Sequence, residues 1–445
     1  MPKKKTALTI EERLQQALVP AEEQPYEVPE NWVWVRLIGN VNSCLDGYRK
    51  PINSSERAKR VGKVPYYGAT GQVGWIDDYL TNEHLVLLGE DGAPFLDLLK
   101  DKAYIIFGEA WVNNHAHILK SYFGEIGNVF LMHYLNMVDY KDYVKGTTRL
   151  KLTQGSMQLM PFPLPPLSEQ QRIVERIEEL FAKLDEAKER LQEVANSFAV
   201  RKAAILHKAF TGELTKQWRL ENGVSDESWE EKTIGEICSS LKYGTSKKSS
   251  DDGEVVVLRM GNLQNGEIDW SNLAYTSDEE DIKKYLLKSG DVLFNRTNSP
   301  ELVGKTSIYR GEMPAIYAGY LIKLDYEKNI VVGDYLNYYL NSSKAKEYYM
   351  QVKTDGVSQS NINAKKIGEF EIPLPTLSEQ HEIVRLIDDL LARERSAQQA
   401  TEQALASIDL MNKFILARAF RGELGTNKAS EASALELLRQ VLAEN

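Results

Sequence analysis

The chain has 445 residues and a formal net charge of −10, with 42% hydrophobic and 27% charged residues. This composition is typical of globular proteins, and the length predicts two or three domains that each bury a core. The acidic balance argues against a uniformly positive nucleic-acid-binding surface, and no stretch of roughly eighteen apolar residues is present to cross a membrane. Residues 1–20 lack the apolar core of a secretion signal, and two cysteines are too few for a disulfide scaffold, so we expect a cytoplasmic protein.

Two long segments of the chain share one pattern of short apolar runs separated by Gly, Asn and Asp. After an amphipathic stretch in residues 1–25, residues 26–162 contain HLVLLGEDG and AYIIFGEAWV, which are typical of strands ending in polar turns, and GNVFLMHYLNMVDYKDYV, which predicts a helix. Residues 216–372 have the same character, with predicted strands in EVVVLRMGNL and DVLFNRTNSP and a predicted helix in VVGDYLNYYLNSSKAKEYYM. We therefore predict two similar mixed α/β domains.

An internal repeat follows each of these segments. PLPPLSEQQRIVERIEEL at residues 163–180 recurs 210 residues later as PLPTLSEQHEIVRLIDDL, and AILHKAFTGEL recurs at the same offset as FILARAFRGEL. A repeat with constant spacing is a property of the architecture, so we predict two equivalent helical units at residues 163–215 and 373–424. An amphipathic tail at residues 425–445 completes the chain.

Apolar residues step by four and three along both units, which predicts two long helices that each pack along their length. Ser168 and Ser378 are the predicted N-caps, and Gly212 and Gly422 are predicted to end the helices. Because both units lie in one chain, we expect them to pair antiparallel as a coiled coil; the alternative is that each packs on its neighbouring domain. The predicted seam consists of Ile173, Ile177, Leu180, Leu184, Leu191, Val194, Phe198, Ile383, Ile387, Leu390, Ile408, Met411 and Ile415.

The paired PLPxLSEQ openings, the AF(T/R)GEL endings and the GDVLFNRTNS block resemble the specificity subunit of type I restriction–modification systems, over residues 26–424. The resemblance implies an α+β protein whose two target-recognition domains are separated by the helical coiled coil. It also implies a non-catalytic subunit that reads a bipartite site in double-stranded DNA and recruits two methyltransferase subunits, and restriction subunits through them. S-adenosylmethionine would then bind to the methyltransferase partner, and ATP and Mg to the restriction partner, with no cofactor or metal in this chain.

Polar loops that follow the predicted strands are candidates for reading bases, because their side chains can match the hydrogen-bonding groups of base edges. A solvated turn is the alternative interpretation of each loop. In the first domain the candidates are Glu90, Asp91, Asn113, Asn114, His115, Thr147, Thr148 and Arg149. In the second domain they are Asn295, Arg296, Thr297, Asn298, Ser358, Gln359, Ser360 and Asn361.

Local clusters of basic residues are candidates for DNA phosphate contacts, although such clusters are more often solvated surface. They are Arg57, Lys59, Arg60, Lys63, Lys242, Lys247, Lys248 and Lys305. Gly304-Lys305-Thr306 resembles part of a nucleotide phosphate loop, but Ser299 stands where the first glycine belongs, so we do not predict ATP binding. His115 and His117 lack a third ligand nearby in sequence, and no Asn-Pro-Pro-aromatic motif of adenine methyltransferases is present. The competing hypothesis is a coiled-coil adaptor that displays two protein-binding heads.

Overall fold

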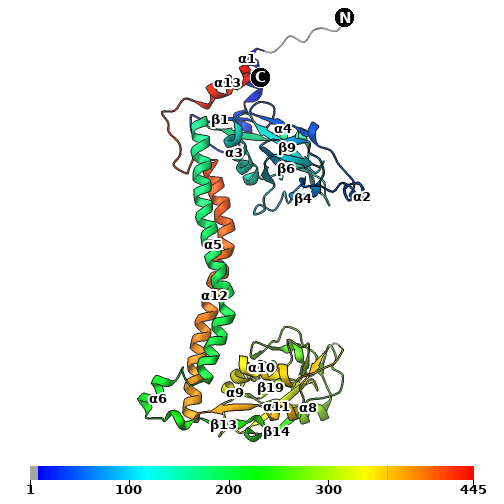
Figure 1. Cartoon of the computed structure of the whole chain (residues 1–445), viewed down its shortest axis with the longest axis vertical. Helices are drawn as coiled ribbons and strands as arrows, with labels where there is room; N and C mark the ends of the chain where they lie inside the picture. The colour runs from blue at the N-terminus through cyan, green and yellow to red at the C-terminus, as the bar shows by residue number, and fades with distance from the viewer. Residues whose placement is uncertain (1–8, 358, 445) are drawn as a thin grey trace. The chain divides into compact units, whose positions relative to one another are not determined.

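The computed structural model describes residues 9–357 and 359–444. The chain separates into two compact units, of which the first comprises residues 1–192 and 402–445 and the second residues 193–401. Each unit contains one mixed α/β domain together with part of both long helices, α5 (Leu167–Phe210) and α12 (Leu377–Ala419), as Figure 1 shows. The predicted α+β architecture with two similar domains and two long helices is therefore confirmed.

The domain of the first unit is built on a four-stranded antiparallel sheet in the order β2-β9-β6-β7. Its central strand β6 (Leu85–Gly89) is buried on both faces, since Val86 and Leu88 point into one core while Leu85 and Leu87 point into another. The first of these cores includes helix α3 (Gly124–Met137) and the beginning of α5. The other strands of this sheet are β2 (Asn42–Cys44), β9 (Ala116–Ser121) and β7 (Ala103–Ile106).

Smaller elements complete the first unit, including a second sheet in the order β4-β3-β8-β5. Its strands are β4 (Gly71–Ile76), β3 (Val64–Gly68), β8 (Glu109–Val112) and β5 (Thr81–Asn82). Two strand pairs are β1 (Val33–Arg36) with β12 (Pro161–Leu164), and β10 (Val144–Lys145) with β11 (Lys151–Leu152). The short helices are α1 (Ile10–Ala17), η1 (Ala21–Glu23), η2 (Asp46–Tyr48), α2 (Ser54–Arg57), α4 (Gln154–Leu159) and α13 (Ala434–Glu444).

The domain of the second unit repeats this plan, with a four-stranded antiparallel sheet in the order β14-β23-β19-β21. Strand β19 (Val292–Asn295) is again buried on both faces, with Val292 and Phe294 in one core and Leu293 in another. The remaining strands of this sheet are β14 (Cys238–Tyr243), β23 (Leu321–Tyr326) and β21 (Thr306–Ile308). Helices α9 (Gly333–Leu340) and α10 (Ser343–Val352) take the place that α3 has in the first domain, against the central sheet and the helix pair.

Further short elements surround this second sheet. The sheets are β18 (Tyr275–Thr276), β15 (Val255–Leu258) and β22 (Ala315–Tyr317); β13 (Glu230–Thr233) and β26 (Glu371–Leu374); β16 (Leu263–Gln264) and β17 (Glu267–Ile268); and β20 (Thr297–Asn298), β25 (Ser360–Asn361) and β24 (Thr354–Asp355). The helices are α6 (Lys216–Asn222), η3 (Asp226–Ser228), α7 (Ile234–Ile237), η4 (Met260–Asn262), α8 (Glu279–Tyr285) and α11 (Ala364–Gly368).

The long helices run antiparallel within each unit. In the first unit, Lys188 of α5 pairs with Asp409 of α12 at 3.1 Å, and Ile173 near the start of α5 shares a core with Leu416 near the end of α12. In the second unit, Arg201 Nε lies 2.9 Å from Glu394 Oε2, while Leu206 shares a core with Ile387. The alternative in which each helix packs only on its neighbouring domain is therefore wrong, although both helices also contact the domains.

Most predicted seam positions face protein, with two corrections. Val194 and Met411 are 39% and 48% exposed, so the prediction is wrong for both. A straight α-helix drifts by about 20° per heptad relative to a strict seven-residue repeat, which turns some nominal seam positions outward. The buried positions are Ile173, Ile177, Ile383, Ile387 and Ile408, and the partly buried ones are Leu180, Leu184, Leu191, Phe198, Leu390 and Ile415.

The helix termini differ in part from the sequence prediction. α5 and α12 begin at Leu167 and Leu377, so Ser168 and Ser378 lie in the first turn and are not the N-caps. The hydroxyl of Thr376 accepts the Glu379 backbone N–H at 3.4 Å, which is the N-cap interaction that the sequence assigned to Ser378. At the other ends, Gly212 and Gly422 have φ of 76° and 72°, the left-handed conformation expected after the last helical turn.

The repeated Ser-Glu-Gln motif places a fully buried glutamate in the first turn of each long helix. Glu169 accepts hydrogen bonds from Trp32 Nε1 at 2.7 Å and Asn427 Nδ2 at 2.8 Å. Glu379 accepts hydrogen bonds from Thr215 Oγ1 and Arg219 Nη1, both at 2.7 Å. Each glutamate therefore binds the segment that follows the end of the other long helix, which explains why the motif recurs.

The two terminal helices pack against each other in the first unit, a question that the sequence left open. Leu14 and Ala17 of α1 join Leu438 and Leu442 of α13 in one core, and Arg439 pairs with Glu11 at 3.5 Å. Among the described residues, no helix is long and apolar enough to cross a membrane.

Candidate nucleic-acid interface

The three polar loops of the first domain meet at one edge of its central sheet. The Glu90 N–H donates to the His115 carbonyl at 2.8 Å, and the Leu152 N–H donates to the Glu90 carbonyl, also at 2.8 Å. Residues 90–92, 113–115 and 147–152 are thus joined through backbone hydrogen bonds, although they are distant in sequence. The fold brings together three groups of candidates that the sequence could only name separately.

Opposite charges are interleaved along this edge. Glu90 pairs with Lys151 at 2.8 Å and with Arg49, which the sequence analysis missed; Asp91 pairs with Arg149 at 2.6 Å and with His115 at 2.7 Å. Burial would raise the pKa of Glu90, but hydrogen bonds from Lys151 and Arg49 outweigh burial and hold that pKa below its ordinary value. Glu90 is therefore ionised, and the carboxylates of Glu90 and Asp91 fix the orientation of the basic side chains that they bind.

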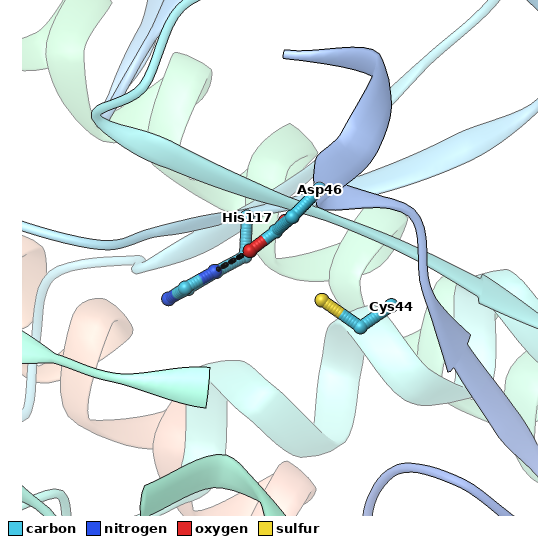
Figure 2. A group of neighbouring side chains, drawn as sticks. All are labelled: Cys44, Asp46 and His117. Carbon is cyan, nitrogen blue, oxygen red and sulfur yellow. Dashed lines mark hydrogen bonds and ion pairs between the residues drawn. The ribbon is translucent and has the colours of Figure 1, made fainter. Parts of the chain in front are cut away.

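Cys44, Asp46 and His117 converge behind this edge from β2, η2 and β9 (Figure 2). Their potential ligand atoms lie within 4.8 Å of one another, and His117 Nδ1 is 2.7 Å from Asp46 Oδ2. These residue types can bind zinc, but Arg49 already places a cation 2.8 Å from Asp46. Burial, followed by the charge of Asp46, raises the pKa of the Cys44 thiol to about 12, and both nitrogens of His117 are already bonded, Nδ1 to Asp46 and Nε2 to the Leu152 carbonyl at 2.9 Å. We interpret the cluster as a hydrogen-bonded support for the polar loops.

Burial separates the first-domain candidates into supporting and accessible residues. Glu90 and Asn113 are only 8% and 7% exposed, so we expect them to orient the loops and not to touch a base. Asp91 and His115 are partly buried and bonded to each other. The exposed candidates are Asn114, Thr147, Thr148 and Arg149.

The second domain arranges the corresponding loops in the same way. The Ile362 N–H donates to the Arg296 carbonyl at 2.8 Å, which matches the bond from Leu152 to Glu90 in the first domain. The hairpin of β24 and β25 stands where β10 and β11 stand, and Asn363 caps the next helix as Thr153 does. Arg296 thus occupies the position of the acidic Glu90, so one backbone scaffold presents different chemistry in the two domains.

Arg296 lies on an aromatic surface. Its guanidinium carbon is 4.7 Å from the centre of the Tyr243 ring, and its Nη1 donates to the Gly319 carbonyl at 3.3 Å. Tyr243 is 41% exposed, and Tyr320, whose carbonyl accepts the Arg296 backbone N–H at 3.0 Å, is 50% exposed. The sequence analysis missed both tyrosines; for Tyr243 the available signal was its position next to Lys242, a candidate for phosphate contacts.

Asn295 and Ser360 are both 0% exposed, which places them in the core and out of reach of a base. They were candidates because each is polar and adjoins a loop, but β19 and β25 carry them inward. The remaining candidates reach solvent at least in part: Arg296, Thr297, Asn298, Gln359 and Asn361. Ser358 lies outside the described residues.

The basic candidates for phosphate contacts divide into engaged and free residues. Lys59, Lys63 and Lys248 are exposed and make no ion pair within the described part of the chain. The engaged residues are Arg57 over the ring of Tyr66, Arg60 with Asp77 and Trp111, Lys242 with Asp325, Lys247 with Asp278, and Lys305 with Gln264. Strand β21 follows Lys305 directly where a phosphate loop would need a helix, which removes the basis for nucleotide binding there.

The comparisons with known proteins agree with this two-domain arrangement. A family model described as the type I restriction modification DNA specificity domain matches residues 29–196 and 226–405. The specificity subunits of the type I restriction enzymes EcoBI and EcoKI, both from Escherichia coli, are 30% identical over 318 residues and 28% identical over 333 residues. These alignments cover 66% and 71% of this chain and the same shares of the two relatives.

Solved structures show the same fold. The crystal structure of the HsdS subunit from Thermoanaerobacter tengcongensis has a TM-score of 0.59 at 19% identity, and covers 90% of this chain and 100% of that chain. A chain from a structural study of complex assembly and conformational transition of the type I R-M system has a TM-score of 0.63 at 18% identity, with the same coverage.

The duplicated domains with exchanged loop chemistry and the two matched segments define a DNA specificity protein. The chain belongs to the family of specificity subunits of type I restriction–modification systems.

Proposed function

We propose that each domain of this chain reads one half of a bipartite DNA site and that the chain itself carries no chemistry. The observation that supports this most directly is the shared scaffold at the two loop edges. Equivalent backbone hydrogen bonds hold Glu90 in one domain and Arg296 in the other, and the accessible side chains around them differ. Two readers with one fold and different loop chemistry are suited to two different base strings.

The hairpin residues Arg149 and Gln359 are our leading candidates for base contacts. They occupy equivalent positions, 210 residues apart, with Arg149 two residues before β11 and Gln359 immediately before β25, and both are exposed. Arginine pairs best with guanine and glutamine with adenine, and a good bidentate contact contributes about 1–3 kcal/mol of discrimination. Arg149 is held by Asp91 at 2.6 Å, an interaction that limits its conformational freedom before binding.

We further propose that the helical repeats set the spacer between half-sites and bind the partner subunits. The partners would be two methyltransferase subunits that use S-adenosylmethionine, and restriction subunits that use ATP and Mg. Support comes from the duplication, which offers two equivalent surfaces for two copies of one partner. The exposed faces of α5 are rich in charged pairs, such as Lys183 with Glu179 and Arg190 with Glu186, and suit a hydrated, specific interface.

The test is to map methylated adenines in a host that carries this gene with its modification gene. In the wild type we expect a split recognition sequence, and in Arg149→Ala we expect relaxed choice at a position in one half only. Lys120→Ala, which removes a solvent-accessible lysine paired with Glu83 at the end of β9 that points away from the loops, serves as the control and should leave the sequence unchanged. An Arg149→Ala complex that keeps the full recognition sequence and affinity would show that this residue does not read a base.

A wild-type complex without salt-sensitive binding to duplex DNA would instead favour the protein-binding adaptor.

A further inference from the structure

In the second unit, three cations without an ion pair among the described residues lie on α5, α10 and α12, three helices that contribute to one core. Ala345 and Tyr349 of α10 belong to the same core as Leu206 of α5 and Leu391 of α12. Lys346, Lys202 and Arg395 lie close to this contact along the three helices, and all three side chains reach solvent.

No carboxylate of the described residues lies within ion-pair distance of Lys202, Lys346 or Arg395. Glu394, which adjoins Arg395 in sequence, is already bonded to Arg201 at 2.9 Å. Desolvation by surrounding protein, then the charges of Lys346 and Arg395, lower the pKa of Lys202. Lys202 is therefore repelled by two neighbouring cations, and no ion pair within the described residues compensates for this, in a chain that has 64 acidic and 54 basic residues. Such an arrangement is expected where an anion binds.

The helix pair of the first unit provides a contrast. There the cation Lys413 of α12 is bonded to Asp101 at 3.0 Å and to the Asn136 carbonyl at 3.3 Å. Its charge is neutralised within the protein, so the uncompensated cluster of Lys202, Lys346 and Arg395 is a specific feature of the second unit and does not follow from the repeat.

Helix α10 connects this cluster to the hairpin that carries Gln359. It has 10 residues, which span about 15 Å, and it is followed directly by β24 of the hairpin. The major groove of DNA is about 12 Å wide, so a hairpin in the groove and a basic cluster one helix length away can contact bases and the adjoining phosphates together. This continuity favours DNA over an acidic protein surface as the partner.

We propose that Lys202, Lys346 and Arg395 bind phosphates of the DNA backbone beside the bases read by the second domain. This inference rests on the proposed function and adds a contact that does not read sequence. Phosphate contacts position the protein on the duplex, whereas base contacts specify the sequence. Loss of the cluster should therefore weaken binding equally for all sequences.

The experiment uses the complex of this chain with its modification subunits and a duplex of about 30 base pairs that carries the methylated sequence mapped in the host. Affinity is measured between roughly 50 and 200 mM salt, where the logarithm of the binding constant falls with a slope of about −0.9 for each phosphate contact. In Lys202→Ala/Lys346→Ala/Arg395→Ala the slope should become shallower by up to about 2.7, with the methylated sequence unchanged.

Two controls distinguish charge from folding. Lys100→Ala/Lys120→Ala/Lys232→Ala removes three solvent-accessible cations that lie outside the long helices and already have carboxylate partners, and should not change the slope. Lys202→Arg/Lys346→Arg keeps the charge and should keep the wild-type slope. If the triple alanine variant does not fold, Lys346→Ala alone should still reduce the slope by about 0.9.

An unchanged slope in a folded, assembled triple variant would overturn the inference. Loss of the modification subunits on size-exclusion chromatography, with DNA binding of the remaining complex unaffected, would also overturn it and assign the cluster to a protein partner. If the wild-type complex itself fails to bind its mapped site, the proposed function fails before the cluster is tested.

Discussion

The buried pair of Arg219 and Glu379 makes a sharp prediction about how the second unit is held together. Arg219 Nη1 lies 2.7 Å from Glu379 Oε1, with the two side chains 8% and 0% exposed. Replacing Arg219 by alanine leaves the carboxylate of Glu379 in the core with only the Thr215 hydroxyl as a hydrogen-bond donor. Removing one partner of a buried ion pair typically costs about 3–5 kcal/mol, because the remaining charge stays desolvated.

The assay is calorimetric or urea-induced unfolding of the full chain, in which we expect Arg219→Ala to lower the stability of the transition that reports the second unit. Arg393→Ala is the matched control, since Arg393 and Asp389 form an exposed pair at 2.8 Å with side chains 74% and 46% exposed. Pairs of this kind contribute about 1 kcal/mol or less. A double-mutant cycle with Glu379→Gln should recover part of the loss, because it removes the stranded charge.

If Arg219→Ala lowers the unfolding free energy by no more than Arg393→Ala does, the prediction is wrong. That outcome would mean that water reaches Glu379 once the arginine side chain is gone. The carboxylate would then not be the desolvated charge on which the estimate rests.

Two further predictions concern the first unit. Gly422→Ala should destabilise the protein more than Gly425→Ala does. Both glycines have a positive φ (72° and 74°), but of the two only Gly422 would place a Cβ against another residue, 2.4 Å from Pro29 Cγ. Urea unfolding of the two variants gives the comparison, and equal losses of stability would contradict the steric argument. Burial lowers the pKa of His133 to about 4, so its contribution to stability is present above pH 6.5 and is lost as the pH falls toward 4. Between these two pH values the wild type should lose on the order of 3 kcal/mol more stability than His133→Gln, which has no group to protonate there. Parallel pH profiles of the two proteins would contradict this prediction.

The repeat and the long helices could be predicted because their signals are local and periodic. Each of these signals involves residues only a few positions apart in the chain: the Ser-Glu-Gln motifs that open the repeats, the spacing of apolar residues along α5 and α12, and the glycines at residues 212 and 422. The same local rules were wrong for Val194 and Met411, where a strict heptad does not follow the actual turn of the helix. Ser378 was also a plausible cap by type, but the helix starts two residues earlier than that cap would place it, directly after Thr376.

The candidate interface shows where local reasoning ends. Residue type selected Glu90, Asn113, Asn295 and Ser360 as readers, and their burial assigns them to the support of the loops. Arg49 was missed because its partners Asp46 and Glu90 are brought to it by different strands.

The duplicated plan, the two mixed domains, the two long helices and, through the repeated motifs, the family could all be inferred from the amino-acid sequence. Periodicity, turn residues and repeat spacing are encoded along the chain and need no partner to be recognised. Tertiary structure alone decided which polar residues reach solvent, which charges are already neutralised, and where Lys202, Lys346 and Arg395 are left without a counterion. Burial and electrostatic interaction depend on distances in space between residues far apart in sequence, and only the folded chain sets those distances.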